Sequence, residues 1–344
     1  MSPGGGRIIL AAGDDGPKST LRPLAGAVQA VLADTAATEV SYWTQLICSH
    51  LAQGLVCGTS DSAAGRAVEA SARRAATNAG IPAVAIEDFP GNYYDVPDGP
   101  VAMLIVESEP VATFTRAKFG AICPRLEVLS PARYDRYRSA APSLRAQVLQ
   151  RWAESGRDSR LILWAGQPET GDCVRTLRCL LPLVRAHELT LLFKAHPRDA
   201  GYSSGTYQAL FAGFEVPYRD ATGLTVPEAL LLAPHLVVTQ FSSVAIEAGF
   251  YGIPSMSILL SDVGGARLLA KKGYPVPPYC ECGGAACVTG VEELPEAFSR
   301  ALGDQAQRKN IMRCFDAYFR TADPMLPPLI ALLESVFESR QIFP

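Results

Sequence analysis

The sequence predicts an α/β protein made of two open parallel sheets, each wrapped by helices. Its 344 residues exceed the ~250–300 at which a single hydrophobic core usually stops growing. Short β-branched or apolar runs alternate with longer helical stretches from end to end, which indicates parallel strands joined by helices. A polar stretch without a strand, residues 131–159, interrupts this alternation. We therefore expect two domains, residues 1–150 and 151–344, with the last helix packing back on the first domain.

The expected elements follow this order along the chain. In the first half we expect strands at 7–12, 54–60, 81–88 and 101–108, with helices at 20–36 and 62–80. In the second half we expect strands that begin at 160, 189, 214, 236, 254 and 286, with helices between them. Ligand crevices of such sheets lie at the carboxyl ends of the strands. The loops that follow strands are therefore the candidate sites.

Composition limits the possible functions. Hydrophobic residues make up 48% of the chain and charged residues 19%, so the chain can bury its cores. A net charge of −3 argues against an extended nucleic-acid surface. No segment approaches the ~20 apolar residues of a membrane span, and the first apolar run is too short for a signal peptide. We expect a cytoplasmic protein, peripheral at the inner membrane if its acceptor is lipid-linked.

The cysteines do not predict a metal or a disulfide framework. Nine are scattered along the chain, which fits reduced thiols. The one cluster, Cys280, Cys282 and Cys287, lacks the fourth ligand and the usual spacing of a zinc site. We expect neither a bound metal nor another cofactor.

Two acidic segments follow strands of the first half. "GDDGPKST", Gly13 to Thr20, resembles a P-loop, but Pro17 stands where that loop needs a glycine. Asp14 and Asp15 are expected to cap a helix, and a role on the acceptor side is the alternative. In "AIEDFPGNYYD", Glu87 or Asp88 fits a general base, although only one of two neighbouring strand residues can point inward. A solvated loop start is the alternative there.

In the second half, strands end in residues suited to a phosphate. Gly166 permits close backbone approach, and Gln167 offers a donor and an acceptor. The stretch "LTLLFKAHPRDAGY" places His196 and Pro197 just after a strand, where an imidazole can donate to a phosphate. An ordinary structural histidine is the alternative, and the neighbouring cations Lys194 and Arg198 fit solvated side chains.

The segment "LVVTQFSSVAIEAGFYGIPSM" carries the most information. A strand delivers Ser242 and Ser243 to the start of a helix, where serines cap it and the helix dipole favours an anion. Glu247 lies one turn further along, within reach of a sugar hydroxyl beside a bound phosphate. With His196 on the same sheet, these residues predict a monophosphate or diphosphate pocket.

This combination resembles the GT-B glycosyltransferases, and more narrowly the bacterial sialyltransferase and polysialyltransferase families. The matching motifs are His196 with Pro197, Ser242 with Ser243, and "GQP" at 166–168. The resemblance implies two Rossmann-like domains facing each other across a cleft. It also implies transfer of a sialic-acid-like sugar from a CMP donor to a glycan or glycolipid hydroxyl, as in surface glycan synthesis.

The resemblance further implies roles for individual residues. Asp88 or Glu87 is the base, while His196 and the serine pair hold the departing cytidine monophosphate in a metal-independent inverting displacement. Phe89 stands where the acidic motif of those families has a glycine. Asp14 to Gly16 matches that motif better in its letters, but follows the first strand, earlier than the family places it.

Three alternatives stay open. The chain also resembles a UDP-N-acetylglucosamine 2-epimerase in Glu247 and its helix, which in that family contacts the ribose. A polyol-phosphate transferase of the teichoic-acid type uses paired histidines, and the first domain offers only His50. The last alternative is a protein that binds a nucleotide sugar without catalysis.

Overall fold

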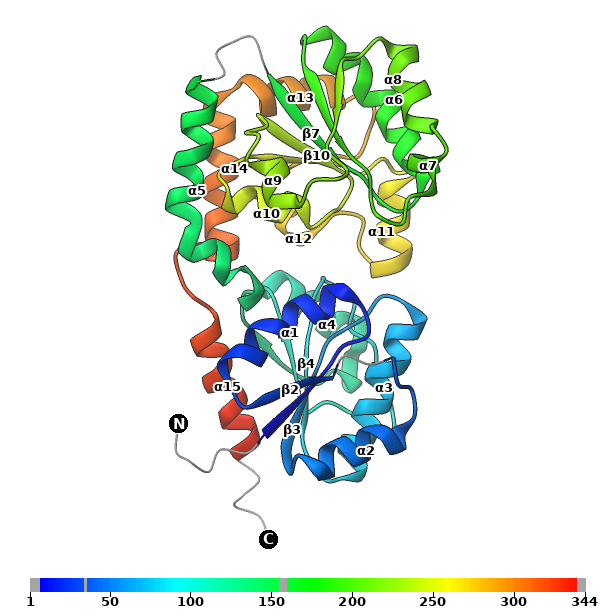
Figure 1. Ribbon diagram of the computed structural model, residues 1–344, viewed down its shortest axis with the longest axis vertical. Helices are drawn as coiled ribbons and strands as arrows, with labels where there is room; N and C mark the ends of the chain where they lie inside the picture. Colours follow the sequence, from blue (N-terminus) through cyan, green and yellow to red (C-terminus); the bar gives the residue numbers. More distant parts are fainter. Residues whose placement is uncertain (1–6, 34–35, 155–159, 339–344) are drawn as a thin grey trace. The chain divides into compact units, whose positions relative to one another are not determined.

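The computed structural model describes residues 7–33, 36–154 and 160–338. The chain divides into two compact units: unit 1 contains residues 1–136 and 323–344, and unit 2 contains residues 137–322. Each unit is built on one six-stranded, all-parallel sheet with helices on both faces (Figure 1). The division falls between Arg136 and Tyr137, near the start of α5 (Asp135–Glu154), because the rest of that helix packs within unit 2.

Unit 1 contains the sheet with strand order β2-β1-β3-β4-β5-β6. Its strands are β1 (Arg7–Ala11), β2 (Ala30–Ala33), β3 (Ala52–Cys57), β4 (Ala83–Ile86), β5 (Met103–Val106) and β6 (Arg125–Val128). Its helices are α1 (Asp15–Ala27), α2 (Val40–Ser49), α3 (Ala63–Asn78), α4 (Glu109–Phe119) and α15 (Leu326–Glu338), with two short 3-10 turns, Gly120–Ile122 and Ala132–Tyr134. The strand order reverses direction between β1 and β3, which places the crevice of this sheet at their carboxyl ends.

The two faces of this sheet follow from the alternation of strand side chains. Ile9 and Leu55 pack with the residues of α2 and α3 on one face. Ile8 and Val56 pack with α1 and α15 on the other. The contact with α15 depends on a glycine: a Cβ at Gly54 would lie 2.4 Å from the ring of Phe337. The last described helix therefore belongs to the core of unit 1.

Unit 2 contains the sheet with strand order β12-β11-β10-β7-β8-β9. Its strands are β7 (Leu161–Ala165), β8 (Thr190–Lys194), β9 (Tyr218–Asp220), β10 (Leu236–Thr239), β11 (Ser255–Ile258) and β12 (Ala286–Val288). Its helices besides α5 are α6 (Thr170–Ala186), α7 (Ala200–Ser203), α8 (Thr206–Phe214), α9 (Val226–Leu230), α10 (Val244–Phe250), α11 (Gly264–Lys272), α12 (Pro278–Glu281), α13 (Leu294–Gly303) and α14 (Gln305–Phe319).

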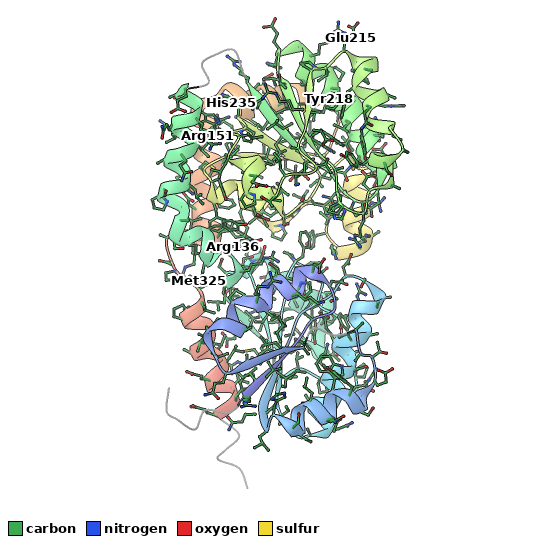
Figure 2. The ribbon with its side chains drawn as sticks, in the orientation of Figure 1. Arg136, Arg151, Glu215, Tyr218, His235 and Met325 are labelled. Atoms are coloured by element: carbon green, nitrogen blue, oxygen red, sulfur yellow. The ribbon has the colours of Figure 1, made fainter. Side chains whose placement is uncertain are left out.

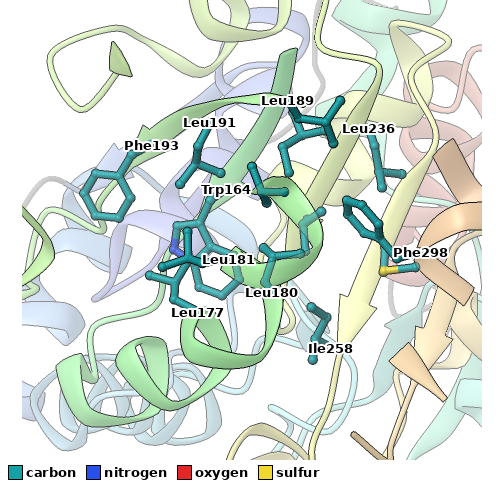
Figure 3. Close-up of a cluster of buried hydrophobic side chains, with 14 of the residues drawn as sticks. Trp164, Leu177, Leu180, Leu181, Leu189, Leu191, Phe193, Leu236, Ile258 and Phe298 are labelled. Carbon is teal, nitrogen blue, oxygen red and sulfur yellow. The ribbon is translucent and has the colours of Figure 1, made fainter. Parts of the chain in front are cut away.

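A cluster of buried side chains covers one face of this second sheet (Figure 3). Trp164 of β7 and Phe193 of β8 pack against Leu177 and Leu181 of α6, and Phe298 of α13 joins them. These side chains are 0–2% exposed. The order of the strands reverses between β7 and β10, so the crevice of unit 2 is expected at the carboxyl ends of these two strands.

Some expected elements differ in the structure. The helix expected over 20–36 is wrong beyond Ala27: residues Ala30–Ala33 form β2, the edge strand beside β1. A short apolar run has no clear period of its own, so pairing with β1 decided its conformation. The strand expected over 214–220 is confined to its last three residues, Tyr218–Asp220. Residues 34–35, 155–159 and 339–343 of the expected segments lie outside the described residues.

Among the described residues, none of the helices combines the length and the hydropathy needed to cross a bilayer.

Candidate functional site

Three loops of unit 2 meet because their strands are neighbours. The strands β10, β7 and β8 are adjacent, and they end in the loops that carry Ser242, Gly166 and His196. The Gly166 amide donates to the Lys194 carbonyl at 2.9 Å, and a Cβ at Gly166 would lie 3.4 Å from the His196 nitrogen. The sheet thus brings these predicted site residues to one edge.

A second set of bonds joins β10 to β7 at the same edge. The Thr239 hydroxyl donates to the Ala165 carbonyl at 2.7 Å and accepts from the Ser242 amide at 3.3 Å. Gln167, only 7% exposed, is fixed by its backbone, whose amide donates to the Cys173 sulfur at 3.2 Å. These hydrogen bonds fix the backbone of the loops that follow β7 and β10.

The imidazole of His196 is half-buried and has a defined tautomer. Its Nδ1 accepts a hydrogen bond from the Arg198 amide at 3.1 Å, so a neutral ring carries its proton on Nε2. Burial, and then the nearby Arg198 charge, lower its pKa from the usual value. The ring is therefore a neutral donor at pH 7. Pro197 and Arg198, which follow it, are exposed.

Lys194 does not point at a phosphate. Its ammonium donates to three carbonyls of the loop after β9, those of Ala221, Thr222 and Leu224. Burial lowers its pKa. The sequence suggested a solvated side chain, but the structure shows a side chain that holds the loop beside β8 together.

The start of α10 offers fewer open donors than the sequence suggested. The Ser242 hydroxyl accepts from the Val244 amide at 3.3 Å, and the Ser242 carbonyl accepts from the Ala245 amide. Ser243 occupies the N-cap position, but its side chain makes no capping bond. Ser243 is exposed, so its hydroxyl is the group of this pair that can meet a ligand.

Glu247 is held by a residue that the sequence did not single out. Its Oε2 accepts a hydrogen bond of 2.5 Å from the hydroxyl of Tyr137, which is 5% exposed. Tyr137 lies at the start of α5, more than a hundred positions earlier in the chain, and no local pattern marks it. The carboxylate of Glu247 is thus placed by a distant hydroxyl.

In unit 1, Asp88 lies at the amino end of α1. Its Oδ1 accepts from the Thr59 hydroxyl at 2.8 Å and from the Asn92 amide at 2.9 Å. Its Oδ2 would lie 2.6 Å from a Cβ at Gly16, in the first turn of α1. The Asp88 carboxylate therefore occupies the place that an anion takes at a helix N-terminus. The segment "GDDGPKST" therefore differs from a phosphate-binding loop, because the Asp88 carboxylate lies where the phosphate would bind.

Glu87 points to a different environment, as the alternation of strand residues requires. It is 4% exposed, and its Oε1 accepts from the Tyr93 amide at 3.0 Å while its Oε2 has no hydrogen-bond partner. Burial raises its pKa to about 8, and the nearby Glu107 and Asp88 act in the same direction. Glu87 is therefore protonated at neutral pH, and an acid rather than a base.

Asp14 forms hydrogen bonds within unit 1, and Asp15 is exposed. Asp14 stands at the N-cap position of α1 without capping it, so that expectation is wrong. Its carboxylate instead accepts from the amide and the hydroxyl of Ser62, at 2.8 and 2.5 Å, because Ser62 begins α3 beside it. Asp15 is exposed in the first turn of α1.

The loops after β1 and β3 are tied together by Glu69, which the sequence analysis missed. This side chain of α3 is 0% exposed. It accepts from the Gly13 amide, after β1, at 3.4 Å and from the amide and the hydroxyl of Ser60, after β3, at 2.8 and 2.6 Å. The Tyr94 hydroxyl donates to it at 3.0 Å. Burial raises its pKa to about 7. A single acid within an Ala-rich helix gave no signal of this role.

No sequence pattern identified Arg133 as a site residue. Its guanidinium donates to the Asp88 carbonyl at 2.8 Å, to the Thr20 hydroxyl at 3.0 Å and to the Tyr134 hydroxyl at 2.8 Å. It therefore connects the turn before α5 with the segment that carries Asp88.

The three clustered cysteines differ in burial: Cys280 is buried, Cys287 is half-buried and Cys282 is exposed. Within 7–33, 36–154 and 160–338, no three His, Cys, Asp or Glu side chains are placed to hold a metal ion.

Comparison with known proteins shows the fold. A putative UDP-N-acetylglucosamine 2-epimerase from Listeria monocytogenes is similar with a TM-score of 0.64 and 14% identity, over 97% of both chains. The UDP-GlcNAc 2-epimerase from Neisseria meningitidis bound to UDP-GlcNAc gives 0.60 and 11%, over 94% of this chain and 99% of that one. MurG of Acinetobacter baumannii gives 0.59 and 12%, over 96% and 99%. No family model and no curated protein matches the sequence.

These likenesses confirm the GT-B type of fold, two α/β units each built on a parallel sheet. At 11–14% identity they show the fold alone. None of the three structures is named as a sialyltransferase, and the one whose ligand is named holds a uridine nucleotide sugar.

Proposed function

We propose that this protein is an enzyme that uses a UDP-sugar, and that unit 2 binds the nucleotide. The observation that carries the proposal is the placing of His196, Ser243 and Glu247 around the carboxyl ends of β8 and β10. The fold is shared with a protein whose structure contains UDP-GlcNAc. Ligands of open α/β sheets bind at this edge, where the strand order reverses.

Each of these residues has a part in the proposed binding. The Nε2–H of His196 donates to a phosphate oxygen, and the exposed Ser243 hydroxyl adds a second donor. Glu247, oriented by Tyr137, accepts from a ribose hydroxyl. Gly166 leaves room for the diphosphate beside the His196 backbone, and Gln167 lies next to it on the same loop. Pro197 keeps the turn after His196 rigid.

We propose UDP in place of the CMP that the motifs first indicated. The His-Pro and Ser-Ser motifs bind a phosphate and do not read the base, so they do not choose between uridine and cytidine. The structural neighbours named above point to uridine. Localisation in the cytoplasm and a glycan or glycolipid acceptor remain part of this proposal.

The proposed reaction is glycosyl transfer with Asp88 as the general base. Two donors converge on one oxygen of Asp88, which fits a carboxylate acceptor, whereas Glu87 carries a proton at neutral pH. Asp88 would take the proton of the acceptor hydroxyl as it attacks the anomeric carbon. The UDP leaving group gains negative charge, and one preorganised donor such as His196 can contribute ~2.7–4 kcal/mol to its stabilisation.

Epimerisation at C2 of a UDP-sugar is the second candidate, because two of the three similar structures are named as 2-epimerases. Removal of the proton at C2 needs a base, and we assign Asp88 of unit 1 to that role. The two reactions differ in their products, so an experiment separates them.

The first experiment tests the nucleotide. Thermal unfolding is measured with UDP, UDP-GlcNAc, CMP and CMP-sialic acid, for the natural protein and for His196→Ala. Ligand at 100 times its dissociation constant adds ~2.7 kcal/mol to the free energy of unfolding. We expect stabilisation by the uridine ligands that His196→Ala reduces. Stabilisation by the cytidine ligands alone would restore the sialyltransferase interpretation, and no response to any ligand would overturn the proposal.

The second experiment tests the reaction. The protein is incubated with UDP-GlcNAc in D2O, with and without a mixture of glycan acceptors, and followed by NMR. Release of UDP that depends on an acceptor indicates transfer. Incorporation of deuterium at C2 without release of UDP indicates epimerisation. Binding without either product indicates the protein that binds a nucleotide sugar without catalysis.

A further inference from the structure

A hollow lies at the amino ends of strands of the unit 2 sheet, opposite the loops that carry His196 and Ser242. Its volume is about 1,030 Å³. Arg160, His235 and Pro254 line it, and they stand at the amino ends of β7, β10 and β11. The nucleotide loops follow the carboxyl ends of β7 and β10, so the length of the strands separates the two places. Figure 2 labels His235, together with Arg151 of the neighbouring helix α5.

The lining of this hollow is strongly cationic. Four of its side chains are positive: Arg160, Arg308, Lys309 and Arg313. Among the described residues of the lining, Asp316 alone has a carboxylate, and it forms an ion pair of 2.5 Å with Arg145. The chain as a whole has a net charge of −3. This concentration of positive charge favours an anionic ligand.

The rest of the lining is apolar and held in place. Leu149, Trp152 and Met312 contribute apolar surface. The indole nitrogen of Trp152 donates to the Ala233 carbonyl at 2.5 Å, and its ring stacks on His235 at 5.5 Å and 25°. The Arg308 guanidinium lies 5.4 Å from the same ring. The indole is therefore preorganised beside the cations.

His235 forms part of the wall of this hollow. Its Nδ1 is buried and has no hydrogen-bond partner. Its carbonyl accepts from Arg308 at 2.7 Å, which fixes the backbone next to it. Burial, and then the charges of Arg308 and Arg160, lower the pKa of this imidazole. Acidic neighbours do not contribute, so the ring is neutral at pH 7.

We propose that this hollow binds an amphiphilic anion, a phosphate ester carried on an apolar body. Lys309 and Arg313 are exposed and lie one turn apart on α14, where both can meet the phosphate. The apolar body lies on Trp152 and Met312. This ligand differs from the nucleotide sugar in site and chemistry, so the inference does not depend on the proposed function. A single dissolved amphiphile and a lipid in a membrane share this chemistry, and the test separates them.

The fluorescence of Trp152 can report the binding of a ligand in this hollow. Of its three tryptophans, Trp43 and Trp164 are 0% exposed, and only Trp152 is partly exposed. Intrinsic fluorescence of the full chain is titrated with dihexanoylphosphatidic acid, which stays dissolved as single molecules. Inorganic phosphate and dihexanoylphosphatidylcholine are the comparison ligands. We expect a saturable change with phosphatidic acid, and binding at least about tenfold weaker for the other two.

Charge reversal tests the role of the cations. The double variant Lys309→Glu with Arg313→Glu is expected to weaken binding of phosphatidic acid about tenfold or more. The matched control is Arg178→Glu with Arg219→Glu, which makes the same change of charge at exposed positions of unit 2 outside the hollow. The control is expected to bind as the natural protein does. In Trp152→Phe the fluorescence change should vanish while calorimetry still detects binding.

Three results would overturn the proposal: no saturable response to phosphatidic acid, equal binding of the zwitterionic lipid, or equal weakening in the control variant. Vesicles of phosphatidylglycerol provide the last arm. If the protein binds these vesicles but not the dissolved lipid, the hollow is not a site for a single amphiphile, and the cations form a membrane-binding surface instead.

Discussion

The hydroxyl of Tyr137 and the carboxylate of Glu247 are joined by a hydrogen bond of 2.5 Å. Tyr137 is the first residue of unit 2, and its ring stacks on Phe250 at 5.8 Å and meets the edge of Tyr251 at 5.9 Å. Phe250 and Tyr251 belong to the end of α10 and the residue after it, and Glu247 lies on the same helix. The start of α5 therefore fixes the carboxylate that we assign to the ribose.

Tyr137→Phe should remove the hydrogen bond that orients Glu247 while keeping the packing of the ring. We expect the natural protein to bind UDP more tightly than 2′-deoxy-UDP, because the deoxy nucleotide lacks the hydroxyl that donates to the oriented Glu247 carboxylate. The variant should lose most of this preference, with a fall of about 0.5–1.5 kcal/mol in the free energy of unfolding. Calorimetry with both nucleotides measures it. Tyr202→Phe, which breaks the bond from Tyr202 to Asp220, should keep the preference. An unchanged preference in Tyr137→Phe would contradict the role of Glu247.

The protonation of His196 leads to a second prediction. Burial and Arg198 lower its pKa, so the ring is neutral from pH 7 to 8 and donates through Nε2. The affinity for UDP-GlcNAc, whose diphosphate keeps a constant charge in this range, should therefore not depend on pH. His196→Ala should weaken binding about tenfold at every pH. His187→Ala, at a histidine bonded to Ser299, is the control. An affinity that falls as the pH rises would show that the imidazolium binds the phosphate.

Most of the fold was predictable because periodicity is a local property. Buried strands such as Leu161–Ala165 and Met103–Val106 are continuous apolar runs, and Ser62 marks the start of α3 with a side-chain cap. The edge strand Ala30–Ala33 was missed because it depends on pairing with β1. The four residues themselves do not indicate that pairing.

The candidate site was predictable only where a residue follows a strand. His196, Gly166 and Ser242 could be placed together because β10, β7 and β8 end at one edge. Tyr137 and Arg133 act through contacts with residues far away in the sequence, and a single sequence carries no record of such pairs. The protonation state of Glu87 also depends on burial, which the neighbouring residues in the sequence do not reveal.

Asp88→Asn tests the proposed base directly. The substitution keeps the size of the side chain, so binding of the UDP-sugar to unit 2 should not change, while turnover should fall by about 10²–10⁴. Asp95→Asn, at an exposed carboxylate nearby in the sequence, should keep full turnover. Initial rates and calorimetric dissociation constants separate the two effects. Full turnover in Asp88→Asn would remove Asp88 from the mechanism.

The raised pKa of Glu87 predicts that the stability of the protein depends on pH. Its pKa is about 8 in the folded protein and near 4.5 when unfolded, so the folded state holds the proton more strongly. This contribution to stability is complete below about pH 4.5 and is lost as the pH rises through about 8. Glu87→Gln imitates the protonated acid and does not titrate. Relative to the natural protein, it should gain stability between pH 5 and 8, by on the order of a few kcal/mol. Urea unfolding across this range measures the difference, and parallel curves would contradict the assignment.

Gly16 offers the sharpest test of how α1 positions Asp88. A Cβ at Gly16 would lie 2.6 Å from Asp88 Oδ2, so Gly16→Ala must displace the carboxylate or the first turn of the helix. We expect a loss of about 1–3 kcal/mol in stability and a fall in turnover without a change in nucleotide binding. Gly26→Ala is a matched control on the same helix, because a Cβ there meets nothing within 4 Å. That control should gain up to about 1 kcal/mol from helix propensity. If both variants keep turnover, the contact between Gly16 and Asp88 does not control the reaction.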